Sequence, residues 1–366
     1  MHLAGQTQAA LEEWARGRGA KAFGARALAR ALLLEFAGRA VAERPAGELL
    51  GQARAVFATQ LPQAEAVSDP DGTVRFAVKL DDGAIVETVA IHQAASETRL
   101  RERWTICVSS QAGCARGCVF CETGRLGLKR NLTAAEIVSQ YALAARYLEG
   151  GGAATAASPR PRNVVFMGMG EPLDNLDEVL RAIEVLREPS GFAVPERRIT
   201  VSTVGIVPKL DELYARTRAQ VAVSLHAVEP QARLALLPVA RKWPLEELRA
   251  AIARAPRTVL LQWTLIAGVN DRDTDADGLA QFAQGLDVRV NLIPLNPGPV
   301  PEQRAPSLDL CRTFQKRLSA AGVRTLLRMP HGQEIGGACG QLAGARRASA
   351  SGLPSARAAD RRTAVS

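Results

Sequence analysis

The spacing of apolar residues changes along this chain, and each change predicts a different kind of structure. Residues 7–19 carry an apolar face at Ala10, Leu11 and Trp14, and a second helical run covers residues 25–36, so we expect helices up to about residue 60. Residues 73–80 and 85–91 alternate apolar and polar positions on either side of the turn sequence DDGA. This alternation predicts a β-hairpin.

From about residue 104, short apolar runs alternate with helical patterns. The runs are WTICVS, NVVFM, ITVST, QVAVSLHA, VLLQWTLI, VRVNLIPLN and VRTLLRM. One helix begins at Thr133, where Glu136 completes a capping box, and others begin near residues 174, 208, 230, 244, 275 and 307. Strands that alternate with helices through short connections form a parallel sheet with right-handed crossovers. The sequence therefore predicts an α/β fold.

Polar residues and glycines follow several of these predicted strands directly. In a parallel barrel, the segments just after the strands build the active site. The residues at such positions are Gly170, Glu171, Ser202, Ser224, His226 and Asn296.

Composition limits the compartment and the kind of partner. The chain has 366 residues, 47% of them hydrophobic, and a net charge of +9, of which residues 343–366 supply +4 through five arginines and one aspartate. A net positive charge fits a nucleic-acid partner, but it also fits the arginine-rich protein composition that a high-GC genome favours. The first residues lack the apolar core of a signal peptide, and no apolar run is long enough to cross a bilayer, so we expect a cytoplasmic protein without a membrane partner.

Three of the six cysteines lie within GCARGCVFCETG. Cys114, Cys118 and Cys121 have the spacing C-x3-C-x2-C. In a reducing compartment, thiols grouped in this way bind metal or act in catalysis more often than they form disulfides. Zinc or an iron–sulfur cluster suits three soft thiolates, but structural zinc takes four ligands. A cluster held by three cysteines leaves one iron open for chemistry.

These cysteines, with Phe120 before the last one, resemble the radical S-adenosylmethionine (SAM) superfamily. The resemblance implies one [4Fe–4S] cluster per chain, whose open iron binds the amino and carboxylate groups of SAM. MGMGEPLDN resembles the superfamily's Gly-Glu motif, in which Glu171 would hold the SAM amino group. A longer series of motifs occurs in this order along the chain: CVSSQAGC, MGMGEPLDN, RRITVSTVGIVPKL, SLHA, TLIAGVND, NLIPLNP and ACGQLAG. Over residues 80–344, this series resembles the RlmN/Cfr family of radical SAM RNA methyltransferases, and it is closer to RlmN.

The family resemblance implies a partial parallel (β/α) barrel of the radical SAM type, with a small N-terminal helical domain. We expect four parts: a helical accessory domain for RNA at 1–65, a β-hairpin linker at 66–103, the barrel with a C-terminal carrier-cysteine segment at 104–342, and a disordered basic tail at 343–366. The implied partners are RNA (23S rRNA, with tRNA as a further candidate) and a reductase such as flavodoxin or ferredoxin, and we expect a monomer.

The resemblance also implies a mechanism with two further thiols. Cys339 would accept a methyl group from one SAM, a second SAM would generate a radical that activates this group, and the carbon would add to carbon 2 of an adenosine. Glu87 would take the ring proton, and Cys107 would release the product by forming a disulfide with Cys339. The SAM contacts implied by motif are Gly170, Glu171, Ser202, Ser224, Leu225, His226 and Asn296.

Simpler interpretations exist for several of these residues. Cys107 is also compatible with a buried strand cysteine, Glu87 with a solvated edge residue and Cys339 with an incidental thiol, whereas Cys311 fits core packing. The chain departs from the family pattern near the carrier cysteine at Gln333 and Gly336, and also at Ala240. The alternatives for function are methylation of carbon 8, as in Cfr, a radical SAM enzyme with a non-RNA substrate, and a zinc-bound RNA-binding module.

Overall fold

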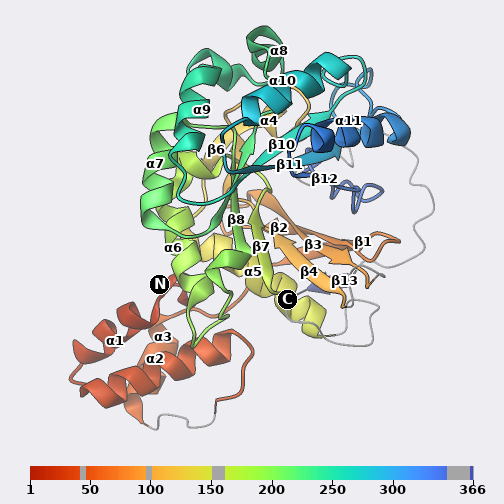
Figure 1. Ribbon diagram of the computed structural model, residues 1–366. Helices are drawn as coiled ribbons and strands as arrows, with labels where there is room; N and C mark the ends of the chain where they lie inside the picture. Colours follow the sequence, from red (N-terminus) through yellow and green to blue (C-terminus); the bar gives the residue numbers. More distant parts are fainter. Residues whose placement is uncertain (42–46, 96–100, 151–160, 344–362, 366) are drawn as a thin grey trace.

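The computed structural model describes residues 1–41, 47–95, 101–150, 161–343 and 363–365. Three N-terminal helices lie together beside the main body of the protein (Figure 1). They are α1 (Gln8–Arg16), α2 (Ala22–Phe36) and α3 (Glu48–Val56). The hydroxyl of Thr7 caps α1 by accepting a hydrogen bond from the backbone of Ala10. Both predicted helices in this region are therefore confirmed.

The main body is built on one sheet with the strand order β12-β11-β10-β9-β8-β7-β4-β3-β2-β1-β13. All pairings from β4 to β12 are parallel, and all those from β13 through β1, β2 and β3 to β4 are antiparallel. The parallel strands are β4 (Arg103–Cys107), β7 (Asn163–Phe166), β8 (Ile199–Thr203), β9 (Gln220–Ser224), β10 (Val259–Leu265), β11 (Val288–Pro294) and β12 (Thr325–Leu327). Each corresponds to one of the predicted apolar runs, so the predicted α/β fold with a parallel sheet is confirmed.

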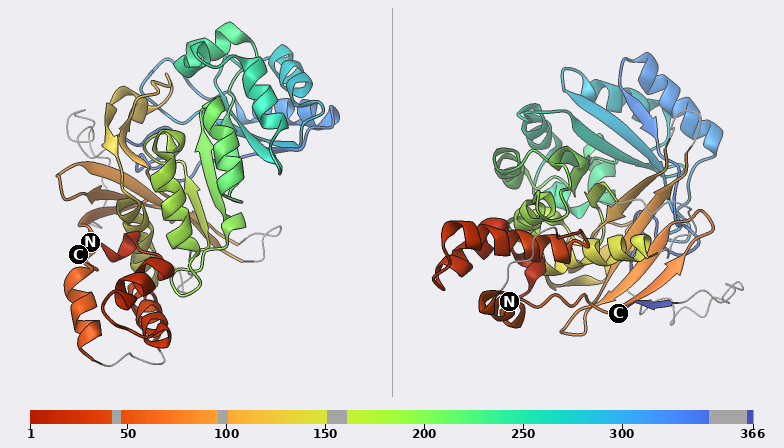
Figure 2. Two further views of the ribbon diagram at one scale, coloured as in Figure 1. Left: turned by 90° about the vertical axis from the view of Figure 1, so that its left-hand side faces the viewer. Right: turned by 90° about the horizontal axis from the view of Figure 1, so that it is seen from below.

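Helices cover the outer face of the parallel strands (Figures 1 and 2). They are α5 (Ala134–Glu149), α6 (Leu176–Arg187), α7 (Val207–Arg216), α8 (Pro230–Leu236), α9 (Leu245–Ala253), α10 (Asp273–Ala283) and α11 (Leu308–Ala320). The predicted capping box is present at the start of α5, where Thr133 and Glu136 bond each other's backbone. Cys311 on α11 is fully buried, as expected for core packing. None of the helices in the described part of the chain is long and apolar enough to cross a membrane.

The predicted hairpin is formed by β2 (Val74–Lys79) and β3 (Ile85–Gln93), preceded by β1 (Ala64–Ser68). Because β3 also pairs with β4, the hairpin extends the parallel sheet without a break. The proposed division into parts at 1–65, 66–103 and 104–342 stays a prediction. The predicted disordered tail falls almost entirely outside the described residues, of which the last three form β13 (Thr363–Val365).

Candidate active site

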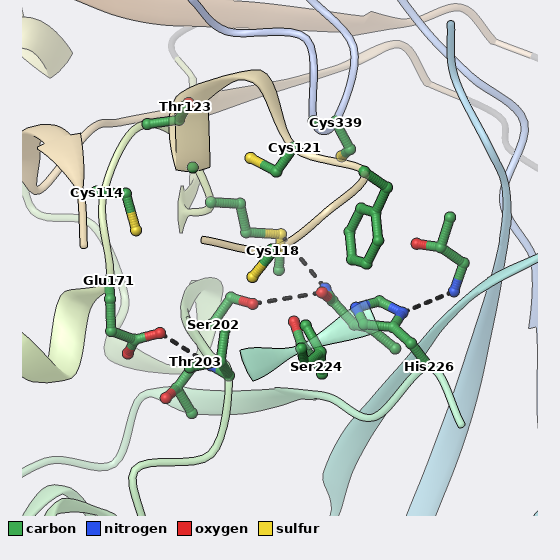
Figure 3. Close-up of a pocket in the computed structure, with 18 of the residues that line it drawn as sticks. Cys114, Cys118, Cys121, Thr123, Glu171, Ser202, Thr203, Ser224, His226 and Cys339 are labelled. Carbon is green, nitrogen blue, oxygen red and sulfur yellow. Dashed lines mark hydrogen bonds between the residues drawn. The ribbon is translucent and has the colours of Figure 1, made fainter. Parts of the chain in front are cut away.

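A pocket opens at the carboxyl ends of the parallel strands (Figure 3). It is lined by residues from β-strand ends, from the loop that carries the three clustered cysteines and from the C-terminal segment. The predicted site residues that line it are Cys114, Cys118, Cys121, Gly170, Glu171, Ser202, Ser224, His226, Asn296 and Cys339. Leu225 is fully buried beside the pocket and is not part of its lining, although its backbone nitrogen bonds the carbonyl of Gln262 at 3.0 Å.

A separate two-stranded sheet carries the cysteine loop, the segment that contains Cys114, Cys118 and Cys121. Cys114 ends β5 (Gln111–Cys114), which pairs with β6 (Gly127–Asn131), and Cys121 precedes the short helix α4 (Glu122–Arg125). The loop is held against α8, because the backbone of Val119 donates to the carbonyl of Leu236 at 3.1 Å. The three thiols therefore lie on a loop that is supported by backbone hydrogen bonds.

The electrostatics of the three thiols favour the binding of positively charged metal ions. Burial raises the pKa of Cys114 to about 12, and it also raises the pKa values of Cys118 and Cys121. Charge on neighbouring thiolates raises the pKa values of Cys114 and Cys118 further. Thiolate is the metal-binding form, so bound cations would relieve this repulsion.

Within the described residues, no three His, Cys, Asp or Glu side chains converge to hold a single metal ion. A cluster sets a different requirement, since each thiolate binds a different iron. Three cysteine thiols that line one pocket are of the donor type that iron–sulfur clusters take.

Glu171 brings a carboxylate into the pocket lining. Its Oε1 accepts from the backbone of Leu173 at 3.0 Å, and its Oε2 accepts from the backbone of Val204 at 2.9 Å (Figure 3). Burial nevertheless raises its pKa to about 7, despite these bonds. The carboxylate thus lines the pocket with both of its oxygens held by backbone hydrogen bonds.

Gly170 allows this arrangement because the chain passes very close to Gln111. Its φ is +101°, and a Cβ at this position would lie 2.5 Å from Cβ and 2.8 Å from the backbone nitrogen of Gln111. The side chain of Gln111 in turn accepts from the backbone of Glu171 at 2.8 Å and donates to Asn131 at 2.7 Å. Glycine is therefore required both by the backbone conformation and by the close contact.

The ends of β8, β9 and β10 form the opposite wall. Ser202 donates to the side chain of Gln262 at 3.3 Å, and Gln262 also reaches the sulfur of Met167 at 3.6 Å (Figure 3). Ser224 lies beside them. Gln262 was missed by the sequence analysis, because a polar residue within the apolar run VLLQWTLI carries no signal of a site.

His226 is held as a neutral ring. Its Nδ1 accepts from the backbone of Thr264 at 2.9 Å, and burial, followed by the positive charge of Arg233, lowers its pKa to about 3. A neutral ring whose Nδ1 accepts carries its hydrogen on Nε2. The ring also packs edge-on against Phe120 of the cysteine loop, with 4.8 Å between centroids. This contact joins the barrel strands to the cysteine loop.

Cys339 reaches the pocket from the C-terminal segment and is exposed there. The side chain of Asn296 donates to the Cys339 carbonyl at 3.0 Å and accepts from Gln333 at 2.8 Å. The segment also contacts the cysteine loop, since the Gly340 carbonyl accepts from the backbone of Glu122 at 2.8 Å. The segment around Cys339 and the cysteine loop therefore line the same pocket.

Glu87 and Cys107 lie outside the pocket lining, on adjacent strands. Glu87 is 1% exposed, forms an ion pair with Arg75 and accepts from the backbone of Ala343 at 2.7 Å. The alternative of a solvated edge residue is therefore wrong, because β3 has a partner strand on each side. Cys107 is buried at the end of β4; burial raises its pKa, and negative charge on Cys339 raises it further.

Comparison with known proteins defines the class to which this fold and site belong. Residues 108–277 match the sequence model of the Radical SAM superfamily. The structure is similar to a radical SAM methyltransferase from Sphaerobacter thermophilus, with a TM-score of 0.80, 36% identity, and coverage of 93% of this chain and 99% of that one. The chain is thus a radical SAM methyltransferase, a class defined by a [4Fe–4S] cluster and SAM.

Two relatives narrow the class to a family. A dual-specificity RNA methyltransferase RlmN from Syntrophobacter fumaroxidans is 43% identical over 345 residues, which cover 91% of this chain and 95% of the relative. A probable RNA methyltransferase from Sorangium cellulosum is 48% identical over 294 residues, which cover 79% of this chain and 71% of the relative. The chain belongs to the RlmN family of radical SAM RNA methyltransferases.

Proposed function

We propose that the protein methylates carbon 2 of an adenosine in RNA through a methylated cysteine, and that it consumes two SAM molecules for each methyl group transferred. The observation that carries this proposal is the position of Cys339. Its thiol lines the same pocket as the three clustered cysteines and Glu171, and negative charge on it adds to the raised pKa of the buried thiol of Cys107. A methyl-carrying thiol must meet both the cofactor and a second thiol.

The residues around the pocket would bind the cluster and SAM. Cys114, Cys118 and Cys121 would hold the cluster, which when bound supplies the electron for SAM cleavage. Glu171 would hold the SAM amino group. The SAM contacts would come from Gly170, Ser202, Ser224, Leu225, His226 and Asn296.

Covalent catalysis would use the remaining three residues. Cys339 would take the methyl group as its sulfur–carbon bond forms, and the carbon would later join the base. Glu87 would accept the proton from carbon 2, with Arg75 beside it to stabilise the carboxylate before the transfer. Cys107 would then attack the sulfur of Cys339, forming a disulfide as the sulfur–carbon bond breaks; the electron pair of that bond stays with the product carbon, which takes up a proton to complete the methyl group, and the unpaired electron left by the radical addition would be lost to a one-electron acceptor, a role that the cluster could supply.

The partners follow from the family. The relatives' names support RNA as the substrate, and we propose 23S rRNA, with tRNA as a second substrate. The target base must leave its stack to reach a pocket at the strand ends. We further propose a flavodoxin- or ferredoxin-like electron donor, a monomeric enzyme, a cytoplasmic location and an accessory role in RNA binding for residues 1–65.

The test traps the reaction between its two thiol steps. Cys107→Ala is expected to accept the methyl group and attack the base but not to release the product, so a nucleotide should remain attached to the peptide around Cys339. Cys339→Ala should give neither methylated protein nor adduct. Cys311→Ala, which removes a buried thiol that is not part of the pocket lining, is the matched control and should accumulate no adduct.

Mass spectrometry of digested protein and RNA reads the outcome. The proposal is wrong if Cys107→Ala gives normal RNA methylation without adduct, or if the product nucleoside carries its methyl group on carbon 8. A protein that binds one zinc and no iron or sulfide on anaerobic reconstitution would be a binding module instead.

A further inference from the structure

One buried cation next to the cysteine loop has no role in the site described so far. Arg233 lies on α8, the helix that braces this loop, and only 1% of the residue is exposed. Its Nη2 donates to the carbonyl of Val204 at 3.2 Å. Its Nε is buried, and no group in the described part of the chain accepts from it.

A buried guanidinium normally has a carboxylate partner, because burying an unpaired charge is unfavourable. Among the described residues, none of the salt bridges involves Arg233. The group with which its charge interacts favourably is the thiolate of Cys118, which opposes the effect of burial on the guanidinium. On its other side, its charge helps to keep His226 neutral. Arg233 thus lies between the cysteine loop and the strand ends, with an unused donor.

A second contact links Arg233 to the SAM side of the pocket. The peptide of Val204 receives Arg233 at its carbonyl, and the backbone nitrogen of the same residue donates to Glu171 at 2.9 Å. Val204 therefore connects Arg233 with the carboxylate of Glu171, which lines the pocket. Such a connection is expected of a residue that orders a cofactor site rather than one that only fills the core.

We propose that Arg233 is an electrostatic positioning residue for the cluster, which offsets the negative charge at Cys118 and raises the reduction potential of the bound cluster. This inference rests on the proposed function, since it needs a cluster on the three cysteines. One-electron reduction adds a negative charge to the site. A fixed cation in a low-dielectric environment stabilises the reduced form more than the oxidised form.

The test separates charge from hydrogen bonding. Arg233→Gln removes the charge but keeps a donor for Val204, and Arg233→Lys keeps the charge but loses the planar fork. Arg241→Gln is the matched control, because it removes an exposed arginine from the segment that follows α8. Each variant is reconstituted anaerobically, and its cluster is titrated with dithionite against mediator dyes, with electron paramagnetic resonance to measure the reduced fraction.

We expect Arg233→Gln to lower the equilibrium constant for reduction at least tenfold, which corresponds to about 59 mV for one electron. Arg233→Lys and Arg241→Gln should stay close to the unmodified protein. The inference is overturned if Arg233→Gln has an unchanged potential, or if Arg233→Lys falls as far as Arg233→Gln, because charge would then not be the cause.

Two further measurements keep the interpretation clear. Thermal unfolding of each cluster-free variant identifies any loss of fold; if Arg233→Gln alone unfolds below the assay temperature while Arg233→Lys does not, a role in folding replaces the proposed role. Iron and sulfide content of the unmodified protein is measured first. A protein that takes up no iron and sulfide contradicts the proposed function itself, whereas a cluster with a potential insensitive to Arg233 contradicts only this inference.

Discussion

Gly170→Ala tests whether the close contact between Gly170 and Gln111 positions Glu171 in the pocket. The added methyl group would lie 2.5 Å from Cβ and 2.8 Å from the backbone nitrogen of Gln111. Gln111 is fully buried and bonds both Asn131 and the backbone of Glu171, so it cannot move away without breaking at least one of these bonds. The substitution is therefore expected to displace Glu171.

The size of the effect follows from two contributions. A left-handed backbone costs a residue with a Cβ about 1–2 kcal/mol. Overpacking a filled site adds about 1–3 kcal/mol. Gly285→Ala is the matched control, because Gly285 also has a positive φ, +77°, but no atom lies within 4 Å of its added Cβ. The control should therefore lose only the first contribution, whereas Gly170→Ala should lose about 2–5 kcal/mol of unfolding free energy in all.

Urea unfolding of both variants and SAM binding to their reconstituted forms provide the measurements. Gly170→Ala should unfold at a lower urea concentration than Gly285→Ala, and its affinity for SAM should fall at least tenfold. Gly285→Ala should bind SAM normally, because it lies in a turn after α10. Equal losses of unfolding free energy in the two variants, together with unchanged SAM affinity, would refute the argument from close packing.

Three further predictions concern the two sides of the pocket. Because the pKa of Glu171 is raised to about 7, its ionised fraction falls roughly tenfold between pH 8 and pH 6, so the Kd for SAM measured by equilibrium dialysis should rise about tenfold over this range, and a flat profile would contradict this. Gln333→Glu cannot donate to Asn296, so methylation of the carrier thiol, followed by mass spectrometry, should slow severalfold; an unchanged rate would show that the contact is incidental. Asp71→Ala should speed hydrogen exchange at Gly332, whose backbone nitrogen donates to the Asp71 carboxylate at 3.0 Å next to the ring of His331, and unaltered exchange would exclude it as an anchor.

The sequence predicted the elements of the barrel because their signals are local. Each parallel strand is a short apolar run, and the capping box at Thr133 identifies the start of α5 from four residues. The C-x3-C-x2-C spacing likewise lies within eight residues, so Cys114, Cys118 and Cys121 were found together. Residues that directly follow strands, such as Glu171, reach the pocket because parallel strands end on one side of a sheet.

Other parts of the site depend on contacts between distant segments, and these left no local signal. Glu87 lies in a hairpin whose sequence does not reveal that β3 also pairs with β4, so its burial was not predictable. Gln262 and Arg233 resemble an ordinary strand residue and an ordinary helix residue. Arginine on a helix usually lies on the solvent-exposed face, yet Arg233 is only 1% exposed here.

The C-terminal segment shows how such long-range contacts limit the chemistry. The glycine-rich stretch around Cys339, which follows β12, favours a mobile segment that could move the thiol. In the structure, however, hydrogen bonds hold this segment on both sides of Cys339. Before Cys339, the backbone of Gly332 donates to Asp71 at 3.0 Å. After it, the carbonyl of Leu342 accepts from the hydroxyl of Thr123 at 2.5 Å.

Cys339 is itself exposed, while Ala338 and Leu342 on either side of it are buried. A thiol presented between two fixed points has a short reach. In the proposed mechanism, the same sulfur must meet SAM, the base and Cys107 in turn. Because the anchors restrict its path, the base and SAM must come to the thiol within one pocket, and the buried thiol of Cys107 must lie within the small movement that the segment still allows.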